Sequence, residues 1–429
     1  MSFFRDWGRF MMAGAIAQAR WEKGISNTVL HDRKRLFLLT LLILPIVIGG
    51  VAFADEIGNA LPEMIGGHEA YTPAEYSMGI FVAAILVGLL AGLITGCIGA
   101  GGGFVIAPAL MSVGIKGILA VGTDLFHIFA KAIMGSVLHR KLGNVSVQLA
   151  MVFVLGSVIG ATLGGVLNRT LYEIDPVLSD AFITTVYSIM LGSLGIYAMR
   201  DFLKGRQNGG STDMSHGGIE TIDEIGGFPK KLQSVNIPPM VNFDQNVVPG
   251  GRRLSWVFLV LSGAVVGLTA GIMGVGGGFL TFPIFVYGLG VSSATTVGTD
   301  IFQIIFTAGF ASISQYAIYG FIFYTLAIGM LLGSLVGIQI GAMVTKVVSD
   351  LTIRGFYAMA VLAGFTNRIF ALPGKLGEMG VLPISESVGN VLDTIGVWAF
   401  FIVIGGFGVW VIGTFLRNIG TLKGEEAGI

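Results

Sequence analysis

Cysteine, histidine and charged residues are scarce in this 429-residue chain. It holds one cysteine, Cys97, and five histidines, and charged residues make up only 12% of it. A single cysteine excludes an internal disulfide and any cysteine-rich metal or cluster site. The sequence also lacks clusters of His, Asp or Met within its apolar segments, which a divalent-metal transporter would need. The formal net charge of zero gives no reason to expect a nucleic-acid partner.

Apolar residues dominate instead. Hydrophobic residues make up 54% of the chain, and the mean hydropathy is +0.83. A soluble protein cannot bury that much apolar surface, and several runs reach the ~20 residues that span a bilayer. The 66 glycines fit close helix packing in lipid. The sequence therefore predicts a polytopic membrane protein.

Charge bias orients the chain. Basic residues cluster at 33–35, 140–141 and 252–253, and such clusters mark the cytoplasmic side. We therefore expect a multi-pass protein of the cell inner (plasma) membrane with both termini in the cytoplasm. The predicted segments are a basic amphipathic segment or disordered basic tail (1–35), a first transmembrane helix (36–53), repeat 1 (76–200), a cytoplasmic linker that is either a strand-rich flap or mobile (201–253), repeat 2 (254–370) and a last transmembrane helix (391–416).

A glycine-rich stretch occurs twice. Residues 92–104 and 267–279 share the pattern G-L-x-x-G-x-x-G-x-G-G-G-F at a constant offset of 175, and Pro108 and Pro283 follow at the same offset. Each glycine costs a helix roughly 1 kcal/mol relative to alanine. Each stretch is therefore expected to break an apolar segment into the two arms of a hairpin.

Two further blocks extend the repeat. Residues 121–126 match 297–302 at an offset of 176, and 156–164 match 333–341 at an offset of 177. Three blocks in the same order indicate a duplication. If the basic clusters are cytoplasmic, both arms of each hairpin must begin and end on the same side of the membrane. Three membrane crossings separate the two hairpins, so the hairpins open to opposite sides and the repeats are inverted. The predicted fold is an all-α polytopic membrane protein with two inverted repeats, each a glycine-broken hairpin plus three transmembrane helices, with extra flanking helices. Secondary transporters often have this architecture.

The paired glycine motif, the Gly-Thr-Asp blocks at 122–124 and 298–300 and the later small-residue helices resemble the sulfite exporter TauE/SafE family of membrane permeases. The resemblance covers about 78–200 and 254–416. It implies transport of a small sulfur-containing anion such as sulfite or an organosulfonate, with export as the family expectation. The N-terminal extension and the long central linker depart from a minimal family member and leave the substrate open.

The glycine breaks are the first candidate site. Unwound backbone and helix N-termini at membrane depth can bind an anion through N–H groups, and such backbone is tolerated only inside protein or along a cavity. The alternative is close packing of helices, which is our interpretation of Gly92/Gly96 and Gly267/Gly271. The glycines predicted to bind substrate are Gly99, Gly101, Gly102, Gly103, Gly274, Gly276, Gly277 and Gly278.

The helices after the breaks carry the second candidate site. Asp124, His127 and Lys131 share one helix face by their spacing of three and four, and the second repeat has Asp300, Gln303 and Thr307 there. Intramembrane charges are costly and usually functional. We predict proton coupling by Asp124, His127 and Asp300, and substrate contacts by Thr123, Thr299, Gln303 and Lys131.

Structural alternatives exist for these residues. Thr123, Asp124 and Asp300 could be N-caps, and Lys131 could pair with Asp124 or extend to the membrane interface. Outside the repeat blocks, Asn367 and Arg368 are a further candidate pair, because Arg368 departs from the charge bias and could face an anion.

The predicted function is therefore a secondary transporter of a small sulfur-containing anion. A passive anion channel could use the same glycines. A membrane-embedded enzyme or accessory protein of sulfur metabolism fits less well, since His31, His68 and His216 lie outside the apolar segments. We expect no catalytic residues, no metal and no cofactor. The expected partners are the anion and the lipid bilayer; the oligomeric state is open, with a homodimer as one option.

Overall fold

A computed structural model describes residues 78–98, 103–141, 145–207, 227–245, 250–344 and 347–418. The predicted segments 1–35 and 36–53, together with Gly99, Gly101 and Gly102, lie outside the described residues. The first half contains α4 (Met78–Ile98), α5 (Gly103–Ser112), α6 (Gly117–Lys141), α7 (Val147–Ile174) and α8 (Pro176–Gln207). The linker contains α9 (Gly227–Ser234), β1 (Met240–Phe243) and β2 (Arg252–Ser255). The second half contains α10 (Trp256–Met273), α11 (Gly278–Pro283), a π-helical turn η4 (Ile284–Leu289), α12 (Ser293–Ala311), η5 (Ser312–Tyr316), η6 (Ala317–Tyr319), α13 (Tyr324–Val344), α14 (Asp350–Glu378) and α15 (Glu386–Arg417).

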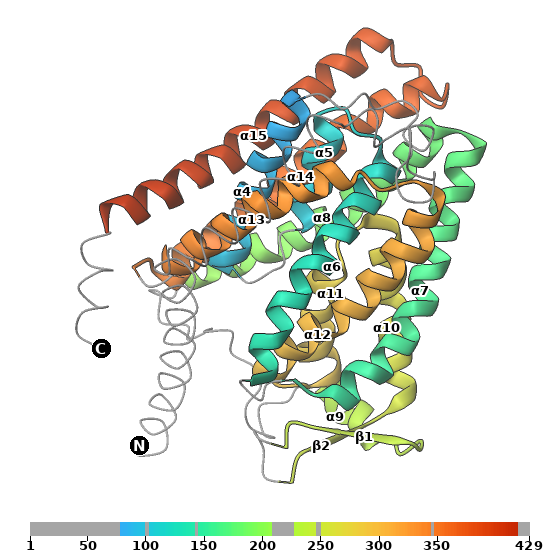
Figure 1. Cartoon of the computed structure of the whole chain (residues 1–429), viewed down its shortest axis with the longest axis vertical. Coiled ribbons are helices and arrows are strands. Elements are labelled where there is room, and N and C mark those ends of the chain that lie inside the picture. The colour runs from blue at the N-terminus through green and yellow to red at the C-terminus, as the bar shows by residue number, and fades with distance from the viewer. Residues whose placement is uncertain are drawn as a thin grey trace, which may run out of the picture.

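Long apolar helices make up most of this structure, as Figure 1 shows. Among the described residues, eight helices are long and apolar enough to cross a bilayer: α4, α7, α8, α10, α12 with its continuation to Tyr319, α13, α14 and α15. The helix α5 is apolar but only 10 residues long. The helix α6, which carries Asp124, His127 and Lys131, is long but more polar. The predicted all-α polytopic membrane fold is confirmed.

Helices of one half pack against helices of the other. Gly88 and Gly92 of α4 lie against the backbone of Met330 and Ser334 in α13. In the same way, Gly263 and Gly267 of α10 lie against Phe153 and Ser157 in α7. In each pair of helices, residue numbers increase in the same direction from one contact to the next. The helix α4 therefore runs parallel to α13, and α10 runs parallel to α7. The interpretation of Gly92 and Gly267 as packing residues is confirmed.

Contacts also fix the directions of the remaining helices. On α12, Thr299 bonds to Ser146 and Thr307 to Ser157, so α12 runs parallel to α7. By contrast, α6 runs antiparallel to α12, because Phe129 meets Gly309 while Gly122 meets Tyr316.

Two further sets of contacts complete the comparison. The helix α6 runs parallel to α13, since Thr123 meets Phe323 and His127 meets Ser334. The helices α8 and α14 are antiparallel, with Gly192 against Phe365 and Gly355 against Phe202. Corresponding helices of the two halves (α4/α10, α6/α12, α7/α13 and α8/α14) therefore run in opposite directions.

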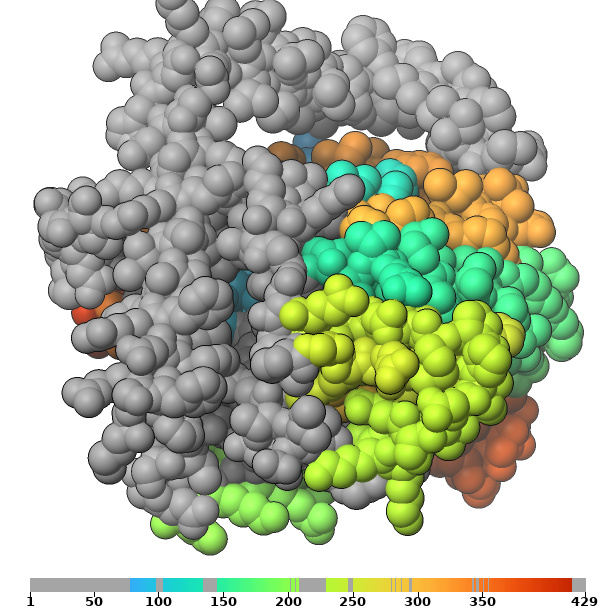
Figure 2. Space-filling view, turned by 90° about the horizontal axis from the view of Figure 1, so that it is seen from below, coloured from blue at the N-terminus to red at the C-terminus, as the bar shows by residue number. Residues whose placement is uncertain are grey.

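The linker folds onto the second hairpin. The strands β1 and β2 pair antiparallel, with Val241 opposite Leu254. Val241, Phe243 and Leu254 are buried in one apolar cluster with Phe285 and Leu289 of η4. Figure 2 shows this segment, in yellow-green, on the face of the molecule where α9, β1 and β2 lie. We call this face the linker face. The opposite face carries the junctions between α5 and α6 and between α7 and α8.

Candidate functional site

The second glycine break is a tight turn that only glycine fits. The residues Gly274, Gly276 and Gly277 have φ of 78°, 67° and 86°, which is the left-handed region where a side chain is strained. The turn ends α10 at Met273 and starts α11 at Gly278. A Cβ on Gly276 would also lie 2.8 Å from Ile128, and one on Gly277 would lie 2.3 Å from Val266. Backbone geometry and close packing therefore both require these glycines.

Buried donors bind the carbonyl groups that the break leaves at the end of α10. The Asn168 amide donates to the oxygens of Gly271 and Ile272 at 3.2 and 3.0 Å. The hydroxyl of Tyr316 donates to Gly271 O, and that of Tyr187 donates to Met273 O. A helix end inside a protein needs such partners. These three residues were missed by the sequence analysis, and only a buried polar position near a helix end could have suggested Asn168.

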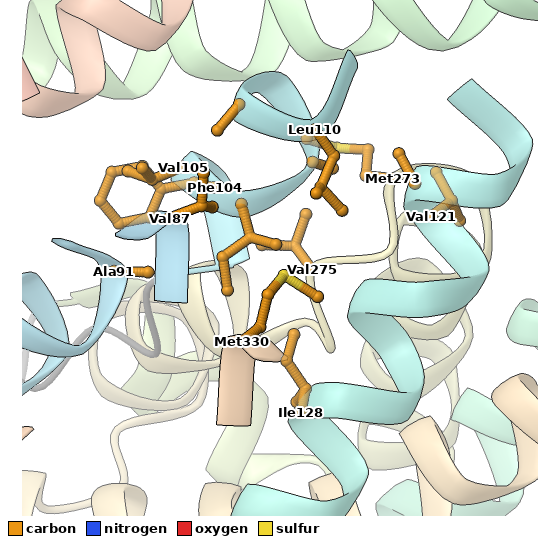
Figure 3. Packing of buried hydrophobic residues seen from close by; sticks show 14 of the residues in the cluster. Val87, Ala91, Phe104, Val105, Leu110, Val121, Ile128, Met273, Val275 and Met330 are labelled. Carbon is orange, nitrogen blue, oxygen red and sulfur yellow. The ribbon is translucent and has the colours of Figure 1, made fainter. Parts of the chain in front are cut away.

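The two breaks meet in the middle of the protein. A Cβ on Gly103, the first residue of α5, would lie 3.0 Å from the side chains of Ile128 and Val275 and 3.2 Å from Val275 Cα. Figure 3 shows Val275 of the second break among Phe104, Ile128 and Met330. The start of α5 therefore lies against the second break, and this contact is apolar and closely packed.

Asp300 lies at the second break and has partners. Its Oδ2 is 3.1 Å from where a Cβ of Gly278 would stand, and the nearby Thr281 hydroxyl donates to Gly277 O at 3.0 Å. The Gln303 amide donates to Asp300 Oδ1 at 2.9 Å, and Thr307 donates to Gln303 Oε1 at 2.6 Å. Thr307 also bonds to Ser157 of α7 at 2.6 Å. This hydrogen-bonded chain connects the second break to the first half of the protein.

Asp124 occupies the corresponding place in the first half but lacks such partners. It is fully buried, and neither carboxylate oxygen has a hydrogen-bond partner among the described residues. The positions that match Thr281 and Gln303 hold Ile106 and His127. His127 is equally buried, and its Nδ1 lies 3.5 Å from Asp124 Oδ1. A buried carboxylate without partners is costly, so this position needs a proton or a cation nearby.

His127 bonds to Ser334 through one ring nitrogen and faces Asp124 with the other. His127 Nε2 lies 3.1 Å from the Ser334 hydroxyl, and that hydroxyl donates to Leu331 O at 3.2 Å. Since a hydroxyl has one hydrogen, Nε2 acts as the donor to Ser334, which leaves Nδ1 facing Asp124. Two lone pairs cannot face each other stably. His127 Nδ1 and Asp124 Oδ1 have no hydrogen-bond partner among the described residues, so one proton placed on either atom would relieve the repulsion between their lone pairs.

A family model for the sulfite exporter TauE/SafE matches residues 84–367 of the chain. The chain belongs to the TauE/SafE family. Two curated proteins of *Bacillus subtilis* (strain 168) are similar along most of their own length: the probable membrane transporter protein YjnA is 25% identical, covering 61% of this chain and 89% of that protein. The probable membrane transporter protein YunE is 24% identical, covering 64% and 91%.

A plant relative shares a shorter region with this TauE/SafE chain. Sulfite exporter TauE/SafE family protein 6 of *Arabidopsis thaliana* is 30% identical over 124 residues, covering 27% of this chain and 29% of that protein. No protein of solved structure matches significantly. The resemblance to the family is confirmed, and the chain is a multi-pass membrane protein of a transporter family.

Of the remaining predicted site residues of this TauE/SafE protein, the two threonines connect its halves and Lys131 contacts its own half. Thr123 Oγ1 accepts the N–H of Phe323 at 3.0 Å, and Thr299 Oγ1 accepts the N–H of Ser146 at 3.0 Å. Each threonine thus binds the segment just before a helix of the other half. Lys131 is partly buried, and its Nζ lies 3.5 Å from the Thr95 hydroxyl on α4. Their predicted contacts with substrate remain predictions.

The N-cap alternative for Thr123, Asp124 and Asp300 is wrong. The helices α6 and α12 begin at Gly117 and Ser293, which is earlier than N-caps at these three positions would require. The three residues therefore lie one to two turns inside the helices. The N-cap of α12 is Ser292, whose hydroxyl accepts the N–H of Thr295. The motif does not mark the start of the helix.

Arg368 is buried against the end of α5. It donates to Asn367 Oδ1 at 2.7 Å, to Ser112 Oγ at 3.2 Å and to Pro108 O at 3.4 Å. These contacts place its charge at a helix C-terminus, where a cation is favoured. Among the described residues, no three His, Cys, Asp or Glu side chains gather as a metal site would require.

Proposed function

We propose that this TauE/SafE transporter exports a small sulfur-containing anion, such as sulfite or an organosulfonate, across the cell membrane. The family description and the printed name of the *Arabidopsis* relative support sulfite as the first substrate to test. Both termini lie in the cytoplasm in this proposal, following the basic clusters. The proposal includes no catalytic step.

The observation that carries the proposal is the contact between the two glycine breaks. Gly103, the first residue of α5, lies against Val275 of the second break. Corresponding helices of the two halves run in opposite directions, which supports two inverted repeats around a central site. In such transporters, broken helices at the midplane bind the substrate, and the halves open to each side in turn. Backbone N–H groups at the breaks would bind the anion, with hydroxyls nearby.

Proton coupling through Asp124 and His127 is the second part of the proposal. In this proposal the pair holds one proton in a fully buried place, next to Ser334 of the other half. An anion at the first break would favour this proton, because it reduces negative charge near the site. Asp300 is the secondary coupling group, since the Gln303 amide already donates to its carboxylate. The proton and the anion would then cross together.

Flux of labelled sulfite into proteoliposomes tests the proposal. Wild-type protein should accumulate sulfite against its gradient when a pH gradient is imposed, whereas a passive channel would only equilibrate it. Asp124→Asn should abolish the accumulation and the pH dependence of flux. Asp175→Asn is the matched control, because the Asp175 carboxylate accepts the N–H of Val177 at the start of α8 and an amide oxygen can accept it as well. Full pH dependence in Asp124→Asn would refute the coupling assignment.

A glycine pair tests the role of the breaks. Gly277→Leu should abolish flux, because position 277 needs a left-handed φ and a Cβ there would lie 2.3 Å from Val266. Gly406→Leu on α15 is the control, since nothing lies within 4 Å of a Cβ at that position. Equal flux in the two variants would refute the role of the break. A binding screen of sulfite, sulfate, thiosulfate, sulfoacetate and taurine would identify the anion.

A further inference from the structure

The second arm of each hairpin is short, α5 in the first half and α11 with η4 in the second. We call these segments the short arms, and each ends in the same kind of loop. We call residues 113–116 and 290–292 the exit loops, since they connect α5 to α6 and η4 to α12. Each has a glycine with a left-handed φ, 92° at Gly114 and 71° at Gly290. A buried apolar residue follows in each, Ile115 or Val291. The loops lie on opposite faces of the molecule, and they are the points about which the arms could move.

An Asp–Arg pair from the linker fixes the exit loop on the linker face. Asp244 accepts the N–H of Ser292 at 2.9 Å and its hydroxyl at 2.7 Å. Arg252 donates to Asp244 at 3.2 Å and to Gly290 O at 2.8 Å. The side chains of Asp244 and Arg252 are 0% and 3% exposed. The linker therefore holds the end of η4 and the start of α12 together.

An Asp and an Arg also hold the two ends of the other exit loop, but among the described contacts they bond to separate partners and not to each other. Asp180 of α8 accepts the N–H of Gly117, the first residue of α6, at 2.8 Å. Arg368 of α14 donates to Pro108 O and Ser112 Oγ at the end of α5. Lys375 lies 3.9 Å from Asp180. Here too a carboxylate holds the start of the following helix and a guanidinium holds the end of the short arm.

The duplication does not explain this likeness. Asp180 and Arg368 lie in α8 and α14, whereas Asp244 and Arg252 belong to the linker, which has no counterpart in the repeat. In both places the charges suit the helix ends, with the anion at an N-terminus and the cation at a C-terminus. Two unrelated parts of the chain thus supply the same constraint at corresponding places.

We propose that the two Asp–Arg clamps are positioning devices that each hold one short arm closed, so that releasing a clamp opens the central site to that face alone. This inference rests on the proposed transport by alternating halves. Both clamps are formed in the structure, which corresponds to a state closed on both faces. The central linker would then control the opening toward its own face.

Thiol labelling from each side tests the clamps. The background carries Cys97→Ala, and the reporters are the corresponding residues Thr299→Cys for the linker face and Thr123→Cys for the opposite face, both buried. A membrane-impermeant maleimide is added to vesicles of known orientation. Asp244→Ala should raise labelling of Thr299→Cys from the linker face several-fold and lower labelling of Thr123→Cys. Asp180→Ala should do the reverse.

Two matched controls separate release of a clamp from general loosening. Arg253→Gln changes the exposed neighbour on β2, and Asp175→Asn changes a helix-start carboxylate on the opposite face. Both should leave the labelling rates unchanged. If Asp244→Ala does not assemble, Arg252→Lys and Arg368→Lys replace the alanine variants, since each keeps the charge but loses the forked geometry.

The labelling result is independent of the substrate. Opposite shifts in the two Asp variants support the clamps even if sulfite is not transported. Labelling that rises at both reporters in one variant, or that matches the controls in both variants, would overturn the inference. Failure of the proposed function would instead appear as absent flux in the wild-type protein.

Discussion

The contacts between the two halves predict which glycines cannot become alanine. Gly160 of α7 and Gly337 of α13 occupy corresponding positions, at an offset of 177. A Cβ on Gly160 would lie 2.0 Å from Ala264 O of α10, and one on Gly337 would lie 2.3 Å from Leu89 O of α4. Both neighbours are backbone atoms of a packed helix. The substitutions Gly160→Ala and Gly337→Ala therefore push whole helices apart.

The distances set the size of the effect. Real Cβ contacts are essentially never under 3.0 Å, so the Gly160 contact must lengthen by 3.0 − 2.0 = 1.0 Å. Overpacking a core typically costs about 1–3 kcal/mol, and a rigid backbone neighbour favours the upper end of that range. Alanine itself is better than glycine in a helix by about 1 kcal/mol. We expect each variant to lose about 2 kcal/mol of the free energy of unfolding, the overpacking cost less this gain.

Thermal melting of the purified protein in detergent measures this loss. The entropy of unfolding is about 2.1 cal/mol/K per residue, or about 0.9 kcal/mol/K for 429 residues, so Gly160→Ala and Gly337→Ala should each lower Tm by about 2 °C. Gly406→Ala on α15 is the control, because nothing lies within 4 Å of a Cβ there, and its Tm should be unchanged or higher. If the three variants melt together, the parallel contacts between halves described above are incorrect.

Two further predictions concern buried polar contacts. Asn168→Leu should lower the free energy of unfolding by about 1–3 kcal/mol, because it removes the donor to Gly271 O and Ile272 O and leaves buried acceptors unpaired. Thermal melting measures this loss, with Asn418→Leu at the end of α15 as the control. Ser334→Ala should shift the pH dependence of sulfite flux, since Ser334 bonds to His127. Ser157→Ala should leave the pH dependence unchanged, since Ser157 bonds to Thr307. Identical pH profiles for the two variants would contradict proton coupling through His127.

The sequence was enough for the main features of the fold and for the family. Apolar runs and the repeated glycine motif located the membrane helices and both breaks, because membrane helices and tight turns depend on local composition. The N-cap interpretation placed the helix starts too late, since α6 and α12 begin at Gly117 and Ser293; the serine before α12 was a start signal that this interpretation overlooked. The partners at the end of α10 were also missed. Asn168, Tyr187 and Tyr316 come from three separate elements, and only the packed structure brings them together.

The two halves differ in the residues around their corresponding carboxyl groups, Asp124 and Asp300. Asp300 accepts a hydrogen bond from the neutral amide of Gln303, whose oxygen in turn accepts one from Thr307. Asp124 has the titratable His127 at the position of Gln303. A duplicated pair of carboxyl groups has thus diverged into one that accepts a hydrogen bond from a neutral amide and one that lies beside a histidine. A transporter with two identical halves would have no reason to bind its proton in one half. Because Asp124 has a titratable neighbour and Asp300 has a neutral one at the same position, our proposal assigns proton coupling to Asp124 and His127 in the first half. It assigns a supporting role to Asp300 in the second half.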